Sequence, residues 1–136
     1  MKTIIILTVF CSLVINNCFS QNKADDILGY YLSPDVKSDD KTQMEIYKTP
    51  DGKYAAKVVW ISNKAKSHFI GTVQIKELTY NPKEKVWKNG KVIYEGGEYS
   101  VTVSISEPEK LKLRGYLGIS LFGKTIYWTK EKELRK

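Results

Sequence analysis

Short segments in which apolar and polar side chains alternate recur along most of this chain, with turn-forming residues between them. The clearest segment runs from Tyr99 to Ile105, where tyrosine, valine and isoleucine occupy every second position and serine or threonine lies between. A period of two places the apolar side chains on one face of an extended strand, as in a sheet with one buried and one solvated face. The pattern therefore predicts an all-β protein.

The turn residues divide the chain into about eight strands. Thr49-Pro50-Asp51-Gly52 predicts a hairpin turn, and Asn89-Gly90 predicts a second one. The strand after the first turn, from Lys53 to Ile61, is expected to place Trp60 on the same face as Tyr54. A polar loop over residues 62–67 and a strand over residues 70–80 are expected to follow.

The order of these elements restricts the topology. Strands do not alternate with helices, which excludes a parallel sheet. Only Ala24 to Leu28 is expected to form a helical turn, capped by an aspartate. Sequential strands joined by tight turns favour an antiparallel meander, and eight such strands can close into a barrel without exposed edges. A β-sandwich is the alternative.

The first twenty residues read as a cleaved signal peptide. A short positive start at Lys2 precedes an uncharged apolar run from Ile4 to Ile15, and a more polar stretch leads to Ser20. The run is too short for a membrane anchor, which needs roughly 20 apolar residues. A lipoprotein with Cys18 as the lipidated residue is a weaker alternative. We therefore expect a signal peptide over residues 1–20 and one domain over residues 21–136, with no transmembrane segment in the mature chain.

The composition limits the chemistry of the mature protein. Both cysteines lie within residues 1–20, so the cleaved protein would hold no thiol and no disulfide. The formal net charge is +7, and the lysines are scattered as on a solvated surface. We expect weak contact with anionic surfaces. We expect no nucleic-acid partner, because export removes the protein from the cytoplasm.

No pattern of a catalytic or metal site stands out. One histidine, His68, and no mature cysteine argue against a metal site. Ser120 lacks the spacing of a serine nucleophile elbow. Glu107 and Glu109 flank a proline in a turn, where solvation explains them. We therefore predict no catalytic residue, no metal, no cofactor and no enzymatic activity.

Four segments of the chain, in order, resemble a known family. They are Asp25 to Gly29, Glu45 to Trp60, Trp87 to Tyr94 and Leu113 to Lys130. This pattern is similar to that of small secreted bacterial proteins known as domain of unknown function number 2147. Two features differ: Tyr31 stands where the family usually has tryptophan, and the segment from Ser62 to His68 is shorter than the family's loop. The resemblance implies a lipocalin-like antiparallel barrel and an envelope or secreted location, and it implies no known activity.

The interior of such a barrel is the best candidate for a binding site, because small barrels either fill with side chains or hold one small ligand. Five aromatic residues are expected to point inward: Tyr31, Tyr54, Trp60, Tyr99 and Trp128. In lipocalin-like barrels a basic residue near the last strand covers an aromatic residue of the first. Here, Arg114 or Lys130 is predicted to cover Tyr31 and close one end through a cation–π contact.

Two functions agree with these features. The first is a non-enzymatic barrel, exported to the periplasm or beyond, that binds a small apolar or amphipathic molecule. The alternative is an envelope interaction protein with a packed barrel, whose basic outer face contacts anionic surfaces or a protein partner.

Overall fold

A computed structural model describes residues 23–34, 38–94, 96–117 and 121–136 of the chain. Two short 3-10 helices and eight strands lie in the described residues. In chain order they are η1 (Ala24–Ile27), β1 (Gly29–Pro34), β2 (Lys41–Lys48), β3 (Tyr54–Ile61), η2 (Lys64–Phe69), β4 (Val73–Asn81), β5 (Val86–Tyr94), β6 (Gly97–Glu107), β7 (Lys110–Leu117) and β8 (Leu121–Glu131). No helix in these ranges is long and apolar enough to cross a membrane.

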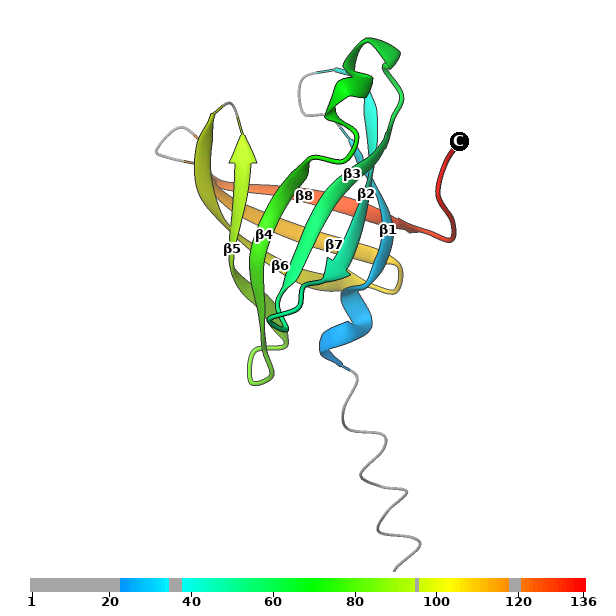
Figure 1. Cartoon of the computed structure of the whole chain (residues 1–136). Coiled ribbons are helices and arrows are strands. Elements are labelled where there is room, and N and C mark those ends of the chain that lie inside the picture. Colours follow the sequence, from blue (N-terminus) through cyan, green and yellow to red (C-terminus); the bar gives the residue numbers. More distant parts are fainter. Residues whose placement is uncertain (1–22, 35–37, 95, 118–120) are drawn as a thin grey trace, which may run out of the picture.

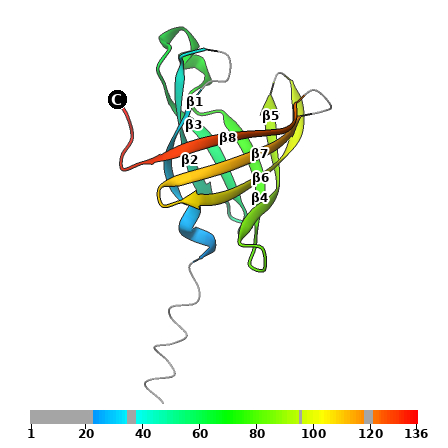
Figure 2. The ribbon, with the colours of Figure 1, turned by 180° about the vertical axis from the view of Figure 1, so that it is seen from behind.

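The strands form a closed antiparallel barrel in simple sequence order (Figures 1 and 2). Each strand pairs with the next, and β8 returns to β1, where Tyr31 lies opposite Lys130. This confirms the predicted eight-stranded meander closed into a barrel, rather than the β-sandwich. The N-terminal helical turn is also confirmed as η1, although Lys23 occupies its cap position without a side-chain hydrogen bond, so the predicted aspartate cap is wrong.

The turn between β2 and β3 forms as its sequence predicts. The Thr49 backbone NH donates to the Lys53 carbonyl at 2.8 Å, and the Gly52 NH donates to the Thr49 carbonyl at 3.0 Å. Gly52 has a φ of 83°, a conformation that glycine adopts at little cost. The Thr49 hydroxyl also contacts the Asp51 carboxylate, which fixes the turn from its side chains.

The Asn89-Gly90 pair does not make the predicted hairpin turn. β5 runs straight through it, and the register with β6 shifts from Trp87 opposite Val103 to Gly90 opposite Val101. Asn89 has a φ of 61°, so it takes the left-handed conformation expected of it within a β-bulge. Because the bulge adds one residue, Trp87 and Gly90 both face the barrel interior, where both are buried.

The core fills the inside of the barrel with apolar side chains. Ile27 of η1, at 0% exposure, packs into this core together with residues of the strands. The buried cluster comprises Ile27, Tyr31, Met44, Ile46, Tyr54, Ala56, Val58, Ile75, Leu78, Trp87, Val101, Val103, Leu111, Leu113 and Trp128.

The connection between β3 and β4 differs from the prediction. Residues 64–69 form η2 instead of an irregular loop, and β4 begins at Val73 rather than at Ile70. Asn63 begins the helix by accepting a hydrogen bond from the Ala65 NH at 3.0 Å. Figure 1 places η2 at the opposite end of the molecule from η1.

Candidate functional site

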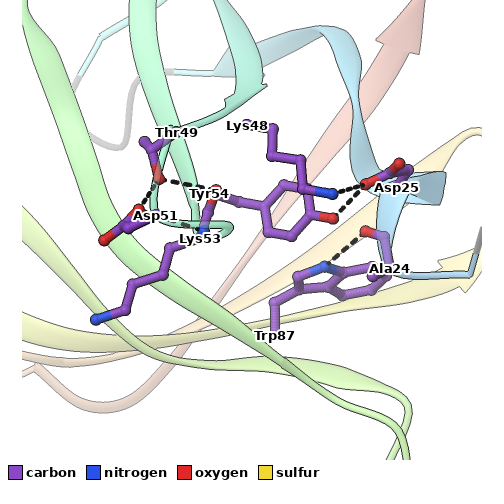
Figure 3. Close-up of polar contacts among 8 residues, drawn as sticks. All are labelled: Ala24, Asp25, Lys48, Thr49, Asp51, Lys53, Tyr54 and Trp87. Atoms are coloured by element: carbon purple, nitrogen blue, oxygen red, sulfur yellow. Dashed lines mark hydrogen bonds and ion pairs between the residues drawn. The ribbon is translucent and has the colours of Figure 1, made fainter.

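One end of the barrel is closed by η1. The Trp87 indole Nε1 donates to the Ala24 carbonyl at 3.1 Å (Figure 3). The Tyr31 hydroxyl donates to the Ile27 carbonyl at 2.9 Å. Both tyrosine and tryptophan pair their polar atom while their rings stay in the core, as buried aromatics of this type require. These two hydrogen bonds hold η1 in place across the end of the barrel, and we call η1 the plug.

A polar latch holds the outer side of this plug. The Tyr54 hydroxyl donates to the Asp25 carboxylate, and the Lys48 ammonium lies 3.3 Å from the same oxygen (Figure 3). The hydrogen bond from Tyr54, followed by the contact with Lys48, lowers the pKa of the Asp25 carboxyl. Burial, and next the Asp25 carboxylate, raise the pKa of Tyr54. The latch therefore favours a charged aspartate beside a neutral tyrosine.

The closed end should lose stability in alkali. Burial, and then the charge of Asp26, raise the pKa of Tyr31 from 10 to about 12, and the pKa of Tyr54 is also raised. As the pH rises, the two tyrosines lose their protons at a lower pH in the unfolded chain than in the folded protein. Their contribution to the free energy of unfolding is therefore complete below about pH 10 and declines above it. For Tyr31 alone, the loss is about 1.4 kcal/mol per pH unit until about pH 12.

Urea unfolding followed by circular dichroism at a series of alkaline pH values measures this decline. Tyr31→Phe and Tyr54→Phe should each flatten it. Tyr127→Phe is the matched control, because Tyr127 is 46% exposed. Lysine ion pairs also weaken in alkali, and that part of the decline should persist in every variant. Equal slopes for all three variants would contradict the assignment.

The interior at the opposite end is more accessible. Tyr99 lies on the same face of β6 as the buried Val101 and Val103, but it is only half-buried. Ile61 and Val92 are also half-buried and pack against the edge of the core. This is the end of the barrel farthest from η1, so a half-buried apolar surface lies above the packed core.

Two hydroxyl groups accompany these apolar residues. Ser33 lies opposite Thr42 in the pairing of β1 with β2, two residues along from the inward pair Tyr31 and Met44. The period of two along a strand therefore directs Ser33 and Thr42 inward as well, and both are half-buried. We define the open-end site as Ser33, Thr42, Ile61, Val92 and Tyr99.

The five aromatic residues expected to face inward do not form one cluster. Tyr31 and Tyr54 are 2% exposed and Trp128 is 5% exposed, and all three belong to the core beneath the open-end site. The rings of Tyr31 and Trp128 lie 6.4 Å apart. Tyr99 lies in the open-end site itself.

Trp60 faces outward, contrary to the prediction. The register between β2 and β3 shifts from Val58 opposite Met44 to Trp60 opposite Gln43, so Val59 is an extra residue in a bulge. The bulge reverses the alternation and turns Ile61 inward in place of Trp60. The sequence carries no clear signal for this exchange, because Trp60 and Ile61 are both apolar.

The C-terminal segment covers Trp60 from outside. The Trp60 indole Nε1 donates to the Lys136 carbonyl at 3.2 Å, and the Arg135 guanidinium lies 5.1 Å from the Trp60 ring centroid. Gln43, at 0% exposure, bonds the Glu133 carbonyl at 2.8 Å and the Arg135 NH at 2.9 Å. Glu131 pairs with Arg135 at 2.6 Å. Residues 132–136 are therefore fixed across the outer face of β2 and β3.

Of the two cations predicted to cover Tyr31, Lys130 does so and Arg114 does not. The Lys130 ammonium lies 5.9 Å from the Tyr31 ring centroid, within cation–π range. Its stem passes over Gly29, where an added Cβ would lie 3.3 Å from the Lys130 Cε. Arg114 is exposed on the outer face of β7 between Thr102 and Thr125, so the prediction for Arg114 is wrong.

The described residues contain no group of three or more histidine, cysteine, aspartate or glutamate side chains placed to hold a metal ion. At the closed end, Asp25 is engaged by Lys48 and by Tyr54, and the members of the open-end site are uncharged. The arrangement can accept an apolar group and a few hydrogen bonds.

Residues 29–130 match the model of a family described as an uncharacterized protein conserved in bacteria, DUF2147. The chain belongs to this family. The match begins at Gly29 and ends at Lys130, two residues that lie close together where the barrel closes. It therefore covers the barrel, while η1 and the segment over Trp60 lie outside it. A comparison with curated proteins gives no match.

A solved structure supports the fold of this DUF2147 chain. Protein HP1028 from the human pathogen Helicobacter pylori, described as belonging to the lipocalin family, is similar with a TM-score of 0.65 and 18% identity. The alignment covers 79% of this chain and 84% of HP1028. The barrel is therefore lipocalin-like, as the resemblance in sequence implied.

Proposed function

We propose that this DUF2147 protein binds a small apolar or amphipathic molecule at the open end of its barrel. The observation that carries the proposal is the difference between the two ends. The end at η1 is filled by buried aromatic residues, while the open-end site presents half-buried Ile61, Val92 and Tyr99. Apolar surface held inside a barrel and left partly accessible is what a small ligand can cover.

The residues of the site favour a particular ligand class. Ser33 and Thr42 on one wall offer hydroxyls, whereas Val92 on another wall is purely apolar. A molecule with an apolar body and a neutral hydrogen-bonding group suits this pairing. A strongly charged group would lose its hydration there without an opposite charge among the described site residues.

We also propose that the protein acts after export, in the periplasm or outside the cell. The positive start, the apolar run and the polar stretch of residues 1–20 support this location.

Native mass spectrometry of protein purified from its own host is the first test, and a retained small molecule is the expected result. Titration with N-phenyl-1-naphthylamine, a neutral apolar fluorophore, is the second. Val92→Phe should narrow the site and lower the affinity for this probe by about 10-fold, because steric overlap of a few atoms costs about 1.4 kcal/mol or more.

Ile93→Phe is the matched control, since Ile93 is the next residue of β5, faces outward and is 38% exposed. It should leave the affinity unchanged. An apo mass together with no binding of the fluorophore would overturn the proposal and favour the interaction protein with a packed barrel. Equal affinities of the two variants would place any binding outside the open-end site.

A further inference from the structure

The connection between β3 and β4 projects beyond the barrel, on the side of the open end (Figures 1 and 2). It carries η2, in which no residue is buried. The segment stands beside the end of the β1–β2 connection, because the Asn63 amide and the Lys66 ammonium each lie 3.3 Å from the Asp40 carboxylate. Because η1 buries Ile27, η2 is the more exposed of the two helices in the described residues.

Two large apolar side chains lie next to each other where this segment returns to the barrel. Phe69 is 47% exposed and Ile70 is 48% exposed. The His68 ring packs 4.2 Å from the Phe69 ring and extends the same surface. Isolated exposed apolar residues are common on soluble proteins, whereas neighbouring ones that form a contiguous patch favour an interaction.

The backbone holds this pair in place. The Thr72 NH donates to the Phe69 carbonyl at 3.0 Å, and the Gly71 NH donates to the Val58 carbonyl of β3 at 2.7 Å. Gly71 has a φ of 94°, which permits the sharp reversal into β4. The two side chains are therefore presented by a hydrogen-bonded turn, which lowers the entropy lost when they enter an apolar phase.

The charged residues within this segment are basic, and one acidic residue, Asp40, lies beside it. Residues 62–72 contain Lys64 and Lys66 and no aspartate or glutamate. Lys66 forms an ion pair with Asp40, while Lys64 has no ion pair among the described residues. Apolar side chains flanked by lysines are the combination that enters the interface of an anionic bilayer.

We propose that residues 64–70, the docking tip, bind the surface of an anionic lipid bilayer. Phe69 and Ile70 enter the boundary between headgroups and acyl chains, and Lys64 contacts the lipid phosphates. Docking in this way directs the open end of the barrel toward the membrane. The proposal goes beyond ligand binding and stands whether or not the barrel holds a ligand.

Sedimentation with phosphatidylglycerol vesicles, compared with phosphatidylcholine vesicles, tests the docking tip. The full chain is expressed and the exported product is used, so that all variants share one N-terminus and differ only at the substituted residues. Phe69→Ser with Ile70→Ser should lower partitioning onto phosphatidylglycerol by about 10-fold. Lys64→Gln should lower it by about five-fold, and added salt should weaken binding of the unsubstituted protein.

Matched controls separate the tip from the general surface. Ile105→Ser with Leu134→Ser removes apolar residues that are 43% and 48% exposed elsewhere. Lys83→Gln removes a charge from the β4–β5 turn. All of these should leave partitioning unchanged, and circular dichroism should show every variant folded.

Absence of binding to phosphatidylglycerol, or equal losses in tip and control variants, would overturn the proposal. Self-association that the tip variants abolish, without vesicle binding, would instead make the tip an interface between copies of the chain. Binding of N-phenyl-1-naphthylamine should not change in the tip variants, so failure of the docking tip and failure of the ligand proposal are distinguishable.

Discussion

Replacing Trp87 with alanine should lower the free energy of unfolding by about 3–5 kcal/mol, the range typical of a tryptophan removed from a core. Trp87 is 2% exposed, its ring lies 4.9 Å from that of Tyr80, and its indole NH bonds the Ala24 carbonyl of η1. The substitution therefore leaves a cavity and also frees the plug. Urea unfolding followed by circular dichroism measures the change.

Trp87→Phe separates the two contributions. Phenylalanine keeps an aromatic ring in the core and loses only the hydrogen bond and part of the volume, so its cost should be about 1–2 kcal/mol. If the two substitutions cost the same, the contact with η1 would outweigh the packing. If Trp87→Ala cost less than about 1 kcal/mol, the assignment of Trp87 to the core would be wrong.

Replacing Gly90 with alanine should destabilise the protein by about 1–3 kcal/mol, the usual cost of overpacking a core. A Cβ at this position would lie 2.5 Å from the Leu78 Cδ2 and 2.9 Å from the Val101 Cγ1. The sign of the effect is informative. Where space allows, alanine in place of glycine stabilises a protein by about 0.4–1 kcal/mol through the unfolded state.

A double-mutant cycle with Leu78→Ala tests the steric explanation. Leu78→Ala alone should cost about 2–5 kcal/mol because Leu78 is 0% exposed. In the Leu78→Ala background, Gly90→Ala should cost less than it does alone or should stabilise, since the clashing methyl group is gone. The changes in urea midpoint at constant slope give the four free energies. Strict additivity would argue against the clash.

The bulges at Val59 and Asn89 show where alternation in the sequence no longer predicts which face a side chain occupies. The period of two placed the predicted faces correctly for Val101 and Val103, where the strand is regular. It failed at Trp60, because one extra residue reverses every later side chain and leaves the composition unchanged. A bulge is decided by pairing with another strand, so the local sequence does not specify it.

At Asn89-Gly90 the local sequence predicts a hairpin turn, whereas the pairing of β5 with β6 produces a bulge. Asparagine favours a left-handed backbone conformation, and Asn89 adopts one. That conformation serves a hairpin turn or a bulge equally well, and the neighbouring strands select the bulge. The burial of Gly90 against Leu78 could not be predicted, because the contact joins β5 to β4 through side chains of the folded barrel.

The sequence predicted what kind of site the barrel holds, but it identified only some of the residues that form the site. The sequence placed Tyr31, Tyr54, Tyr99 and Trp128 inside correctly, and it left the cation over Tyr31 open between Arg114 and Lys130. The pairing of Tyr31 with Lys130 across the closing strands decides that choice. Gln43 gave no signal, since its partners lie some ninety positions away in the C-terminal segment.

The closing contact of β1 with β8 has a consequence for how the chain folds. Each of the other pairings joins neighbours in sequence, so hairpins can form early and add to one another at low entropic cost. β1 can pair on this side only with β8, which comes from the far end of the chain. This pairing closes a loop that contains nearly the whole domain. Until then both strands expose unpaired edges, where a second molecule can bind in place of the correct partner. Lys130 over Gly29 and Tyr31, with Gln43 holding the chain beyond β8, stabilises the closed ring at this joint and so lowers the fraction of molecules in which those edges are open.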